Sequence, residues 1–194
     1  METEFEATFT NIDKTQIRAR LEKAGAALER PEYLQKRIPF HLPKEKRSDH
    51  IWARVRDEGD KITMSVKTIG GAKIDDQKEI CIEVSSFDNA VELLTTIGCV
   101  PKAFQETRRE LWLLDGVEVT IDEWPFLEPF VEVEGESEAV VISASKKLGF
   151  NYDDALFCAV GKLYADKYGI DMDQINDCTK QIIFDMENPF LIAA

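Results

Sequence analysis

One short pattern occurs near both ends of the strand-rich part of this sequence. FVEVEG covers residues 130–135 and EFEATF covers residues 4–9, and each holds two glutamates two positions apart between apolar neighbours. In a β-strand, residues two apart share a face, so both carboxylates of a pair would point the same way. The direction of that face decides the fold. Carboxylates that face water indicate an ordinary sheet, and carboxylates that face an interior indicate a charged tunnel.

Length and composition indicate a soluble globular chain. The 194 residues suit one main domain, and 44% hydrophobic with 31% charged residues is typical of globular proteins. Apolar runs stay below the length that spans a bilayer, and the start METEFEATF lacks a basic region followed by an apolar one. We therefore expect a cytoplasmic protein without a membrane partner.

Charge and cysteine spacing argue against a nucleic-acid partner and against a zinc site. A net charge of -13 predicts no nucleic-acid partner, because phosphate backbones are bound mainly by cationic surfaces. The four cysteines are far apart and form no CxxC motif, so we expect reduced thiols rather than a zinc site. These cysteines are Cys81, Cys99, Cys158 and Cys178.

Periodicity and turn signals predict eight strands, mostly joined as antiparallel hairpins, and five helices, which places the chain in the α+β class. The predicted strands are residues 2–9, 33–40, 50–56, 61–68, 77–84, 100–113, 117–122 and 130–134. The predicted helices are residues 14–26, 87–97, 138–148, 153–168 and 172–184. Gly169 is the best boundary, which divides the chain into a main domain, residues 1–169, and a helical C-terminal appendage, residues 170–194.

Alternate positions along the strands separate into a polar face and an apolar face. The polar face carries Glu4, Glu6, Thr8, Arg54, Arg56, Thr63, Ser65, Lys67, Glu79, Cys81, Glu83, Thr107, Arg109, Thr120, Asp122, Glu132 and Glu134. The apolar face carries Phe5, Phe9, Val55, Val66, Ile80, Ile82, Ile121, Val131 and Val133. An open sheet with helices on its apolar side fits this pattern, and so does a closed sheet with its polar face inward. Periodicity alone does not choose between them.

The order and spacing of the polar residues resemble the CYTH family, also called triphosphate tunnel metalloenzymes, over about residues 1–150. The shared elements are Glu4-x-Glu6, Arg54-Val55-Arg56, Thr63-x-Ser65-x-Lys67, Glu79 to Glu83, Arg109, Asp122 and Glu132-x-Glu134. The family includes class IV adenylyl cyclases, thiamine triphosphatases and inorganic triphosphatases. The resemblance implies a closed eight-stranded antiparallel β-barrel with a polar lumen that binds a triphosphate and a divalent metal, and with helices packed outside.

The resemblance also assigns roles to residues whose chemistry suits them. Guanidinium groups bind phosphate oxygens through paired hydrogen bonds, and Mg²⁺ or Mn²⁺ takes carboxylate oxygens as ligands. The implied substrate-binding residues are Arg54, Arg56, Lys67 and Arg109. The implied metal ligands are Glu4, Glu6, Glu132 and Glu134, with Asp122 and Glu83 as second choices. The implied catalytic residues are Glu4, Glu6, Lys67 and Arg109.

The absence of several catalytic motifs limits the types of reaction that the sequence predicts. It has no GxxxxGK[ST] phosphate loop, no GxSxG elbow and no HExxH helix, and its two histidines, His41 and His50, lie in or beside a loop rich in proline and lysine. Metal-assisted attack on phosphorus is therefore favoured over covalent catalysis. With water as nucleophile the protein is a triphosphatase, and with the ribose 3′ hydroxyl of ATP it is an adenylyl cyclase.

Three positions depart from the family pattern, because Thr8 and Thr107 stand where basic residues are usual and Cys81 stands where another carboxylate is frequent. Two hypotheses therefore stay open. One is a metal-dependent enzyme acting on a small molecule that carries a triphosphate. The other is a tunnel protein that has lost catalysis and binds a phosphorylated ligand or partner. The apolar stretch Gln181–Ala194 could dock on the barrel or on a second subunit, which is compatible with a homodimer.

Overall fold

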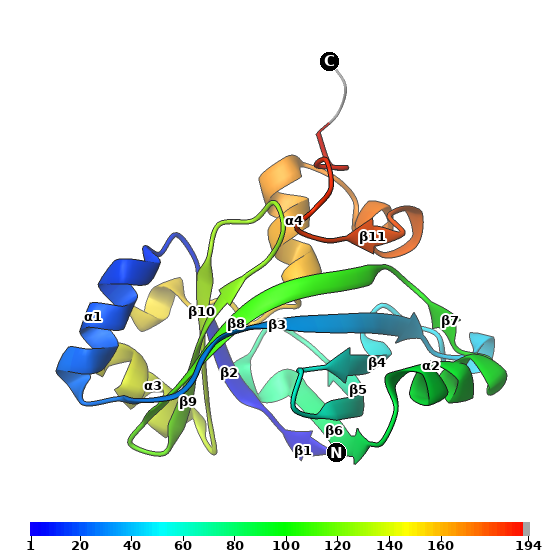
Figure 1. The fold of residues 1–194 in the computed structure, drawn as a ribbon. Helices are drawn as coiled ribbons and strands as arrows, with labels where there is room; N and C mark the ends of the chain where they lie inside the picture. Colours follow the sequence, from blue (N-terminus) through cyan, green and yellow to red (C-terminus); the bar gives the residue numbers. More distant parts are fainter. Residues whose placement is uncertain (192–194) are drawn as a thin grey trace.

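One sheet contains every strand of the described chain, residues 1–191 of a computed structural model. The strands are β1 (Glu2–Thr3), β2 (Phe5–Phe9), β3 (Ala27–His41), β4 (Ile51–Asp57), β5 (Ile62–Ile69), β6 (Gln77–Val84), β7 (Val100–Pro101), β8 (Phe104–Leu114), β9 (Val117–Glu123), β10 (Phe130–Gly135) and β11 (Gln181–Ile182). All pairings are antiparallel except that of β11 with β8. Figure 1 shows the long strands β3 and β8 running side by side across the molecule.

The N-terminal segment closes the sheet. The strand order is β1-β6-β5-β4-β3-β8-β9-β10-β2, so the list begins and ends on two strands that follow each other directly in the chain. β1 pairs with β6 and β2 pairs with β10, while the Glu4 amide between them donates to the Gln77 carbonyl at 3.0 Å. The sheet is therefore a nearly closed barrel. Counting β1 and β2 as one strand gives the eight predicted strands, and β7 and β11 are short additions.

The helices pack outside this barrel, as predicted. They are α1 (Lys14–Ala24), α2 (Phe87–Thr96), α3 (Glu138–Lys147) and α4 (Val160–Tyr168), with short helical turns η1 (Lys44–Lys46), η2 (Ile74–Asp76), η3 (Tyr152–Asp154) and η4 (Gln174–Cys178). In Figure 1, α1 and α3 lie at one side of the barrel, α2 lies at the opposite side beside β7, and α4 lies above the strands near β11. The predicted α+β class with a closed barrel is confirmed.

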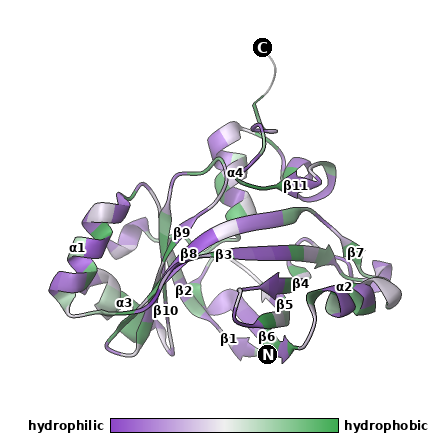
Figure 2. Cartoon of the chain, in the orientation of Figure 1, coloured by the Kyte–Doolittle hydropathy of each residue, from purple (hydrophilic) through white to green (hydrophobic). Residues whose placement is uncertain are grey.

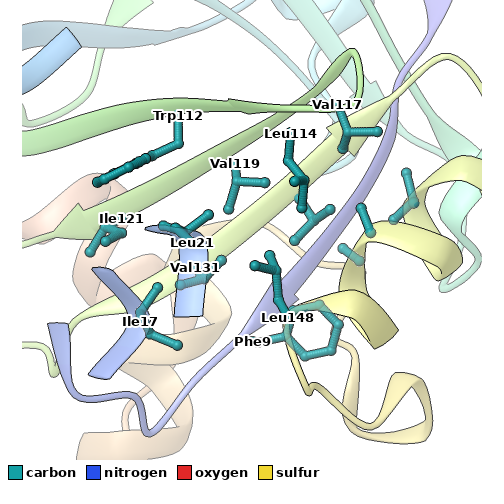
Figure 3. Packing of buried hydrophobic residues seen from close by; sticks show 14 of the residues in the cluster. Phe9, Ile17, Leu21, Trp112, Leu114, Val117, Val119, Ile121, Val131 and Leu148 are labelled. Carbon is teal, nitrogen blue, oxygen red and sulfur yellow. The ribbon is translucent and has the colours of Figure 1, made fainter. Parts of the chain in front are cut away.

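The main core lies between the barrel wall and helices α1 and α3. Asp13 caps α1 by accepting the Gln16 amide at 2.9 Å, and Gly25 ends it in the left-handed conformation with φ of 80°. Between these two caps, Ile17 and Leu21 form the buried face of α1, which packs against the outside of the barrel. Figure 3 shows these two residues among apolar side chains of the outer faces of β8, β9, β10 and β2. The apolar face of the strands thus points outward to the helices, and the polar face points into the barrel.

Three sequence predictions need correction. Ile80 and Ile82 were expected beneath a helix, but they are 52% and 51% exposed, because α2 packs against β4 and β5 rather than over β6. The helix predicted over residues 172–184 is wrong in its second half, since the helical residues end with η4 at Cys178 and β11 follows. The helix predicted over residues 153–168 begins later, at Val160. Residues 192–194, the end of the predicted appendage, lie outside the described residues.

Hydrophilic and hydrophobic residues alternate along much of the sheet, and hydrophilic residues predominate along β3 (Figure 2). No helix within residues 1–191 combines the length and the apolar character needed to cross a membrane.

Candidate functional site

A cavity of about 350 Å³ occupies the barrel interior, and charged side chains from strands distant in the sequence line it. Its cations are Arg37, Arg54, Arg56, Lys67, Lys102 and Arg109, and its carboxylates are Glu4, Glu6, Asp49, Glu79, Glu118, Glu132 and Glu134. Every residue predicted for the site except Asp122 and the second-choice Glu83 is therefore brought to one cavity.

Arginines from neighbouring strands form one wall of the cavity, called here the basic wall and made of Arg37, Arg54, Arg56 and Arg109. Arg37 on β3 stands directly opposite Arg56 on β4. Arg54 donates to Glu79 at 2.9 Å, and Arg56 pairs with Glu58 at 2.8 Å. Burial lowers the pKa of Arg56, and the charge of Arg54 lowers it further. Guanidinium groups on neighbouring strands repel one another where little water screens them, so the basic wall is suited to an anion.

Carboxylates form the facing wall, called here the acidic wall and made of Glu6, Glu118, Glu132 and Glu134. Glu134 on β10 stands opposite Glu6 on β2 and Glu118 on β9, which places three carboxylates in one row. Burial and the charge of Glu6 raise the pKa of Glu134 to about 7. Burial, Glu6 and Asp122 raise the pKa of Glu132 to about 8. The acidic wall therefore holds more negative charge than its surroundings neutralise.

Lys67 joins the acidic residues at the N-terminal closure of the barrel. Its Nζ lies 2.9 Å from Glu4 Oε2 and 3.8 Å from Glu6 Oε1. Burial opposes the charge of Lys67, but Glu6 and Glu4 outweigh burial and raise its pKa. Burial and the neighbouring Glu79 raise the pKa of Glu4 to about 8. Burial alone would raise the pKa of Glu79, but Arg54 and the hydrogen bond with Glu4 outweigh it and lower that pKa to about 2.

Asp122 fixes the position of Arg109. It is fully buried and lies outside the cavity lining. Arg109 donates to Asp122 through Nε at 2.8 Å and through Nη2 at 2.9 Å, and Thr120 donates to the same carboxylate at 2.6 Å. Arg109 Nη2 also donates to Glu132 at 2.6 Å. Because both oxygens of Asp122 are occupied, the structure makes it a positioning group for Arg109. Its assignment as a metal ligand stays a prediction, as does that of Glu83, which is exposed and does not line the cavity.

Several charged lining residues, among them Arg37, Lys102 and Glu118, are not among the site residues predicted from the sequence. Glu118 follows the same two-residue alternation on β9 as the predicted Thr120 and Asp122, so its signal was available, whereas Arg37 lies beside Lys36 on β3 and alternation does not choose between them. Lys102 lies in the turn between β7 and β8, where strand periodicity gives no signal. Arg37 Nη2 donates to Thr107 Oγ1 at 2.5 Å, so a cation from β3 lies beside one of the positions that depart from the family pattern.

The C-terminal segment covers part of the cavity. Tyr164 of α4, Met172 and Ile175 of η4 are among its lining residues. The Tyr164 hydroxyl donates to the Pro125 carbonyl at 2.6 Å. His41, the last residue of β3, is buried and contacts Asp177 Oδ1 through Nε2 at 2.5 Å. His41 is therefore a strand residue, beside the loop, that anchors this segment, whereas His50 is exposed in the loop before β4.

Glu4 and three carboxylates of the acidic wall form a donor set that suits a hard divalent cation. Glu4, Glu6, Glu132 and Glu134 offer only oxygen atoms, which Mg²⁺ and Mn²⁺ prefer, and their mutual repulsion would be relieved by a positive ion. Within the described residues, no three carboxylate, histidine or cysteine side chains are already grouped to hold a metal ion. Lys67 and Arg109 neutralise part of this charge in the structure, so a metal would take over contacts that these cations now make.

Comparison with known proteins assigns the family. The family model described as CYTH domain matches residues 2–151, and the chain therefore belongs to the CYTH family. No curated protein matches the chain.

Solved structures with the same fold are distant in sequence. The PH1012 protein of Pyrococcus horikoshii OT3 is 21% identical with a TM-score of 0.65, over 78% of this chain and 93% of that one. A proposed adenylate cyclase from Vibrio parahaemolyticus is 11% identical with a TM-score of 0.72, over 84% and 98%. A proposed adenylyl cyclase from Hippeastrum, described as having a dominant triphosphatase activity, is 13% identical with a TM-score of 0.53, over 89% and 99%. At these identities the likeness concerns the fold.

Proposed function

We propose that this protein is a metal-dependent enzyme that binds a triphosphate in the barrel cavity and cleaves a phosphoanhydride bond by hydrolysis. One observation carries the proposal: four arginines converge on a cavity whose facing wall consists of carboxylates. A triphosphate chain brings several negative charges to the basic wall, and a divalent cation brings positive charge to the acidic wall. The two ligands together match both walls, which neither ligand does alone.

The residues of the chain have separate tasks in this proposal. Arg54, Arg56 and Arg109 bind the phosphate oxygens and stabilise the negative charge that increases on them in the transition state. Asp122 fixes the direction of the Arg109 guanidinium through two hydrogen bonds, so little reorganisation is needed when the ligand enters. The lumen also restricts bulk water, which strengthens each charged contact.

Mg²⁺ or Mn²⁺ would be held by Glu4, Glu6, Glu132 and Glu134, and when bound it supplies Lewis acidity toward phosphate oxygens and toward water. Lys67 lines the cavity and contacts Glu4 at 2.9 Å, and it would be available to bind a phosphate oxygen if Glu4 ligated the metal. Hydrolysis needs no second organic group positioned for attack. The activity described for the Hippeastrum protein supports the same choice.

The test is product release from ATP, thiamine triphosphate and tripolyphosphate with Mg²⁺ or Mn²⁺. Inorganic phosphate is the expected product. Pyrophosphate together with cyclic AMP would instead identify class IV adenylyl cyclase chemistry, and ligand binding without any product would identify a binding tunnel.

A pair of matched variants connects the activity to the cavity. Glu132→Gln removes one carboxylate charge from the acidic wall without changing its size, and we expect it to reduce the metal-dependent rate at least tenfold. Glu136→Gln makes the same change at an exposed position just after β10 and outside the cavity lining, so its rate should stay within twofold of wild type. Equal rates in the two variants would contradict the assignment of the cavity as the active site.

A further inference from the structure

Arg37 is a buried cation without an ion-pair partner. It is only 5% exposed and lines the cavity, but no carboxylate in residues 1–191 lies within ion-pair distance of it. Its Nη2 donates to two neutral acceptors, Gln35 Oε1 at 2.6 Å and Thr107 Oγ1 at 2.5 Å, and its Nε has no partner. The other arginines of the basic wall each have a carboxylate. A buried charge that lacks a counter-ion is unfavourable in a protein of fixed structure.

The charges nearest to Arg37 increase this imbalance. Arg56 is its direct cross-strand neighbour on β4, and the charges of Arg54, Arg56 and Arg109 all act on it. Burial lowers the pKa of Arg37 well below its usual range, and these three arginines lower it further. Asp122 opposes that effect, but both of its oxygens already accept hydrogen bonds from Arg109. The position is therefore complementary to an anion that enters the cavity.

The surroundings of Arg37 hold its guanidinium in one orientation. The group lies over the ring of Trp124, with its central carbon 4.7 Å from the ring centroid. Trp124 packs edge-on against Tyr164 of α4, at 6.4 Å between ring centroids. On the other side, the Thr107 hydroxyl donates to Gln35 Oε1 at 3.2 Å, so the acceptors of Arg37 are bonded to each other. This packing fixes the cation before any ligand is bound, which lowers the cost of binding.

We propose that Arg37 is a phosphate-binding residue of the tunnel and that Arg37 and Arg56, from adjacent strands, hold the same phosphoryl group. The inference rests on the proposed function, because the anion it requires is the triphosphate. It adds a residue from β3, a strand that contributes no residue to the predicted site. It also supplies a cation beside Thr107, where the side chain carries no charge.

A purely structural role for Arg37 leads to the opposite expectation for stability. If Arg37 served only to support the fold, replacing it would weaken the fold and leave ligand affinity nearly unchanged. If it serves to bind phosphate, a shorter neutral residue such as glutamine would remove repulsion in the ligand-free protein and weaken binding. Stability and affinity should then change in opposite directions on Arg37→Gln.

The experiment measures tripolyphosphate binding by calorimetry and unfolding by denaturant, on the full chain with EDTA so that no turnover occurs. Arg37→Gln should raise the dissociation constant at least tenfold while its unfolding midpoint stays equal to wild type or rises. Arg37→Lys keeps the charge without the planar donor pair and should fall between the two. Arg30→Gln is the matched control, because Arg30 is on the same strand but outside the cavity lining, and its dissociation constant should stay within twofold of wild type.

The outcomes separate this inference from the proposed function. If wild-type protein binds tripolyphosphate and Arg37→Gln and Arg37→Lys bind it equally well, the inference is overturned and the proposed function stands. If the wild-type protein does not bind it with EDTA, the same variants are compared with Mg²⁺ present, and absence of wild-type binding there as well overturns both. If Arg37→Gln fails to fold, Arg37→Lys decides: a dissociation constant like that of wild type overturns the inference, and a several-fold rise supports it.

Discussion

The buried pair of Arg109 and Asp122 should contribute far more to stability than the surface pair beside it. Asp122 is fully buried, and it accepts two hydrogen bonds from Arg109 and one from Thr120. Asp122→Asn would remove the charge and turn an amide N–H toward a guanidinium donor. Breaking one partner of a buried ion pair costs about 3–5 kcal/mol. Glu132 remains 2.6 Å from Arg109, so the lower end, about 3 kcal/mol, is expected.

The adjacent register position offers a matched control. Arg108 and Glu123 face each other one residue along the same two strands, at 3.2 Å, but their side chains are 43% and 28% exposed. Glu123→Gln should therefore cost about 1 kcal/mol, because water reaches both of its pairs, with Arg108 and with Lys14 at 2.9 Å.

Urea denaturation of the metal-free protein at pH 7 measures both free energies of unfolding. For a chain of this size, a loss of about 3 kcal/mol corresponds to a fall in melting temperature of about 6–12 °C. If Asp122→Asn and Glu123→Gln lose the same stability, the reasoning from burial is refuted. A loss confined to Asp122→Asn would also support the positioning role of Asp122, since the Arg109 contact would be its main task.

Two further predictions test the lumen and the core. The metal-free protein should lose stability as pH rises from about 5 to about 8.5, because the raised pKa values of Glu4, Glu132 and Glu134 make the folded state bind more protons than the unfolded state in that range. Thermal unfolding with EDTA should show this slope and Mg²⁺ should flatten it, and a rise with pH would show that these carboxylates are not repelling one another. Ile121→Ala should cost about 2–5 kcal/mol because Ile121 is 1% exposed in the main core, whereas Ile82→Ala on the uncovered face of β6 should cost well under half of that by the same denaturation assay.

The sequence predicts the barrel strands well because each is short and regular. Their inward positions follow a strict alternation, and hairpin turns carry their own signals, as in Asp115-Gly116, where φ is 52° and 84°. Closure of the sheet is not visible in local periodicity. It depends on β1 and β2 pairing with β6 and β10, which are far away in the sequence, so only the family resemblance indicated it.

The residues and elements that the sequence did not predict were missed for physical reasons. On β3, Lys36 and Arg37 put a cation on each face, so alternation alone does not identify the one that enters the lumen. The β3–β8 pairing also shifts register twice near Arg30, which breaks the pattern in the first half of the strand. The C-terminal region shows apolar residues at helical spacing, but Thr179 is extended and its hydroxyl bonds to the Gln174 carbonyl, which ends η4 and leads the chain to the edge of β8.

The separation of charge inside the barrel explains how a protein with a net charge of -13 can suit a polyanion. Net charge governs interactions at long range, whereas the lumen concentrates arginines on one wall and carboxylates on the other at short range. A triphosphate alone satisfies the basic wall and meets repulsion from the acidic wall, and a divalent cation alone has the reverse difficulty. Each ligand therefore improves the site for the other, and by linkage the effect is reciprocal. Mg²⁺ should therefore change the affinity for tripolyphosphate by the same factor by which tripolyphosphate changes the affinity for Mg²⁺.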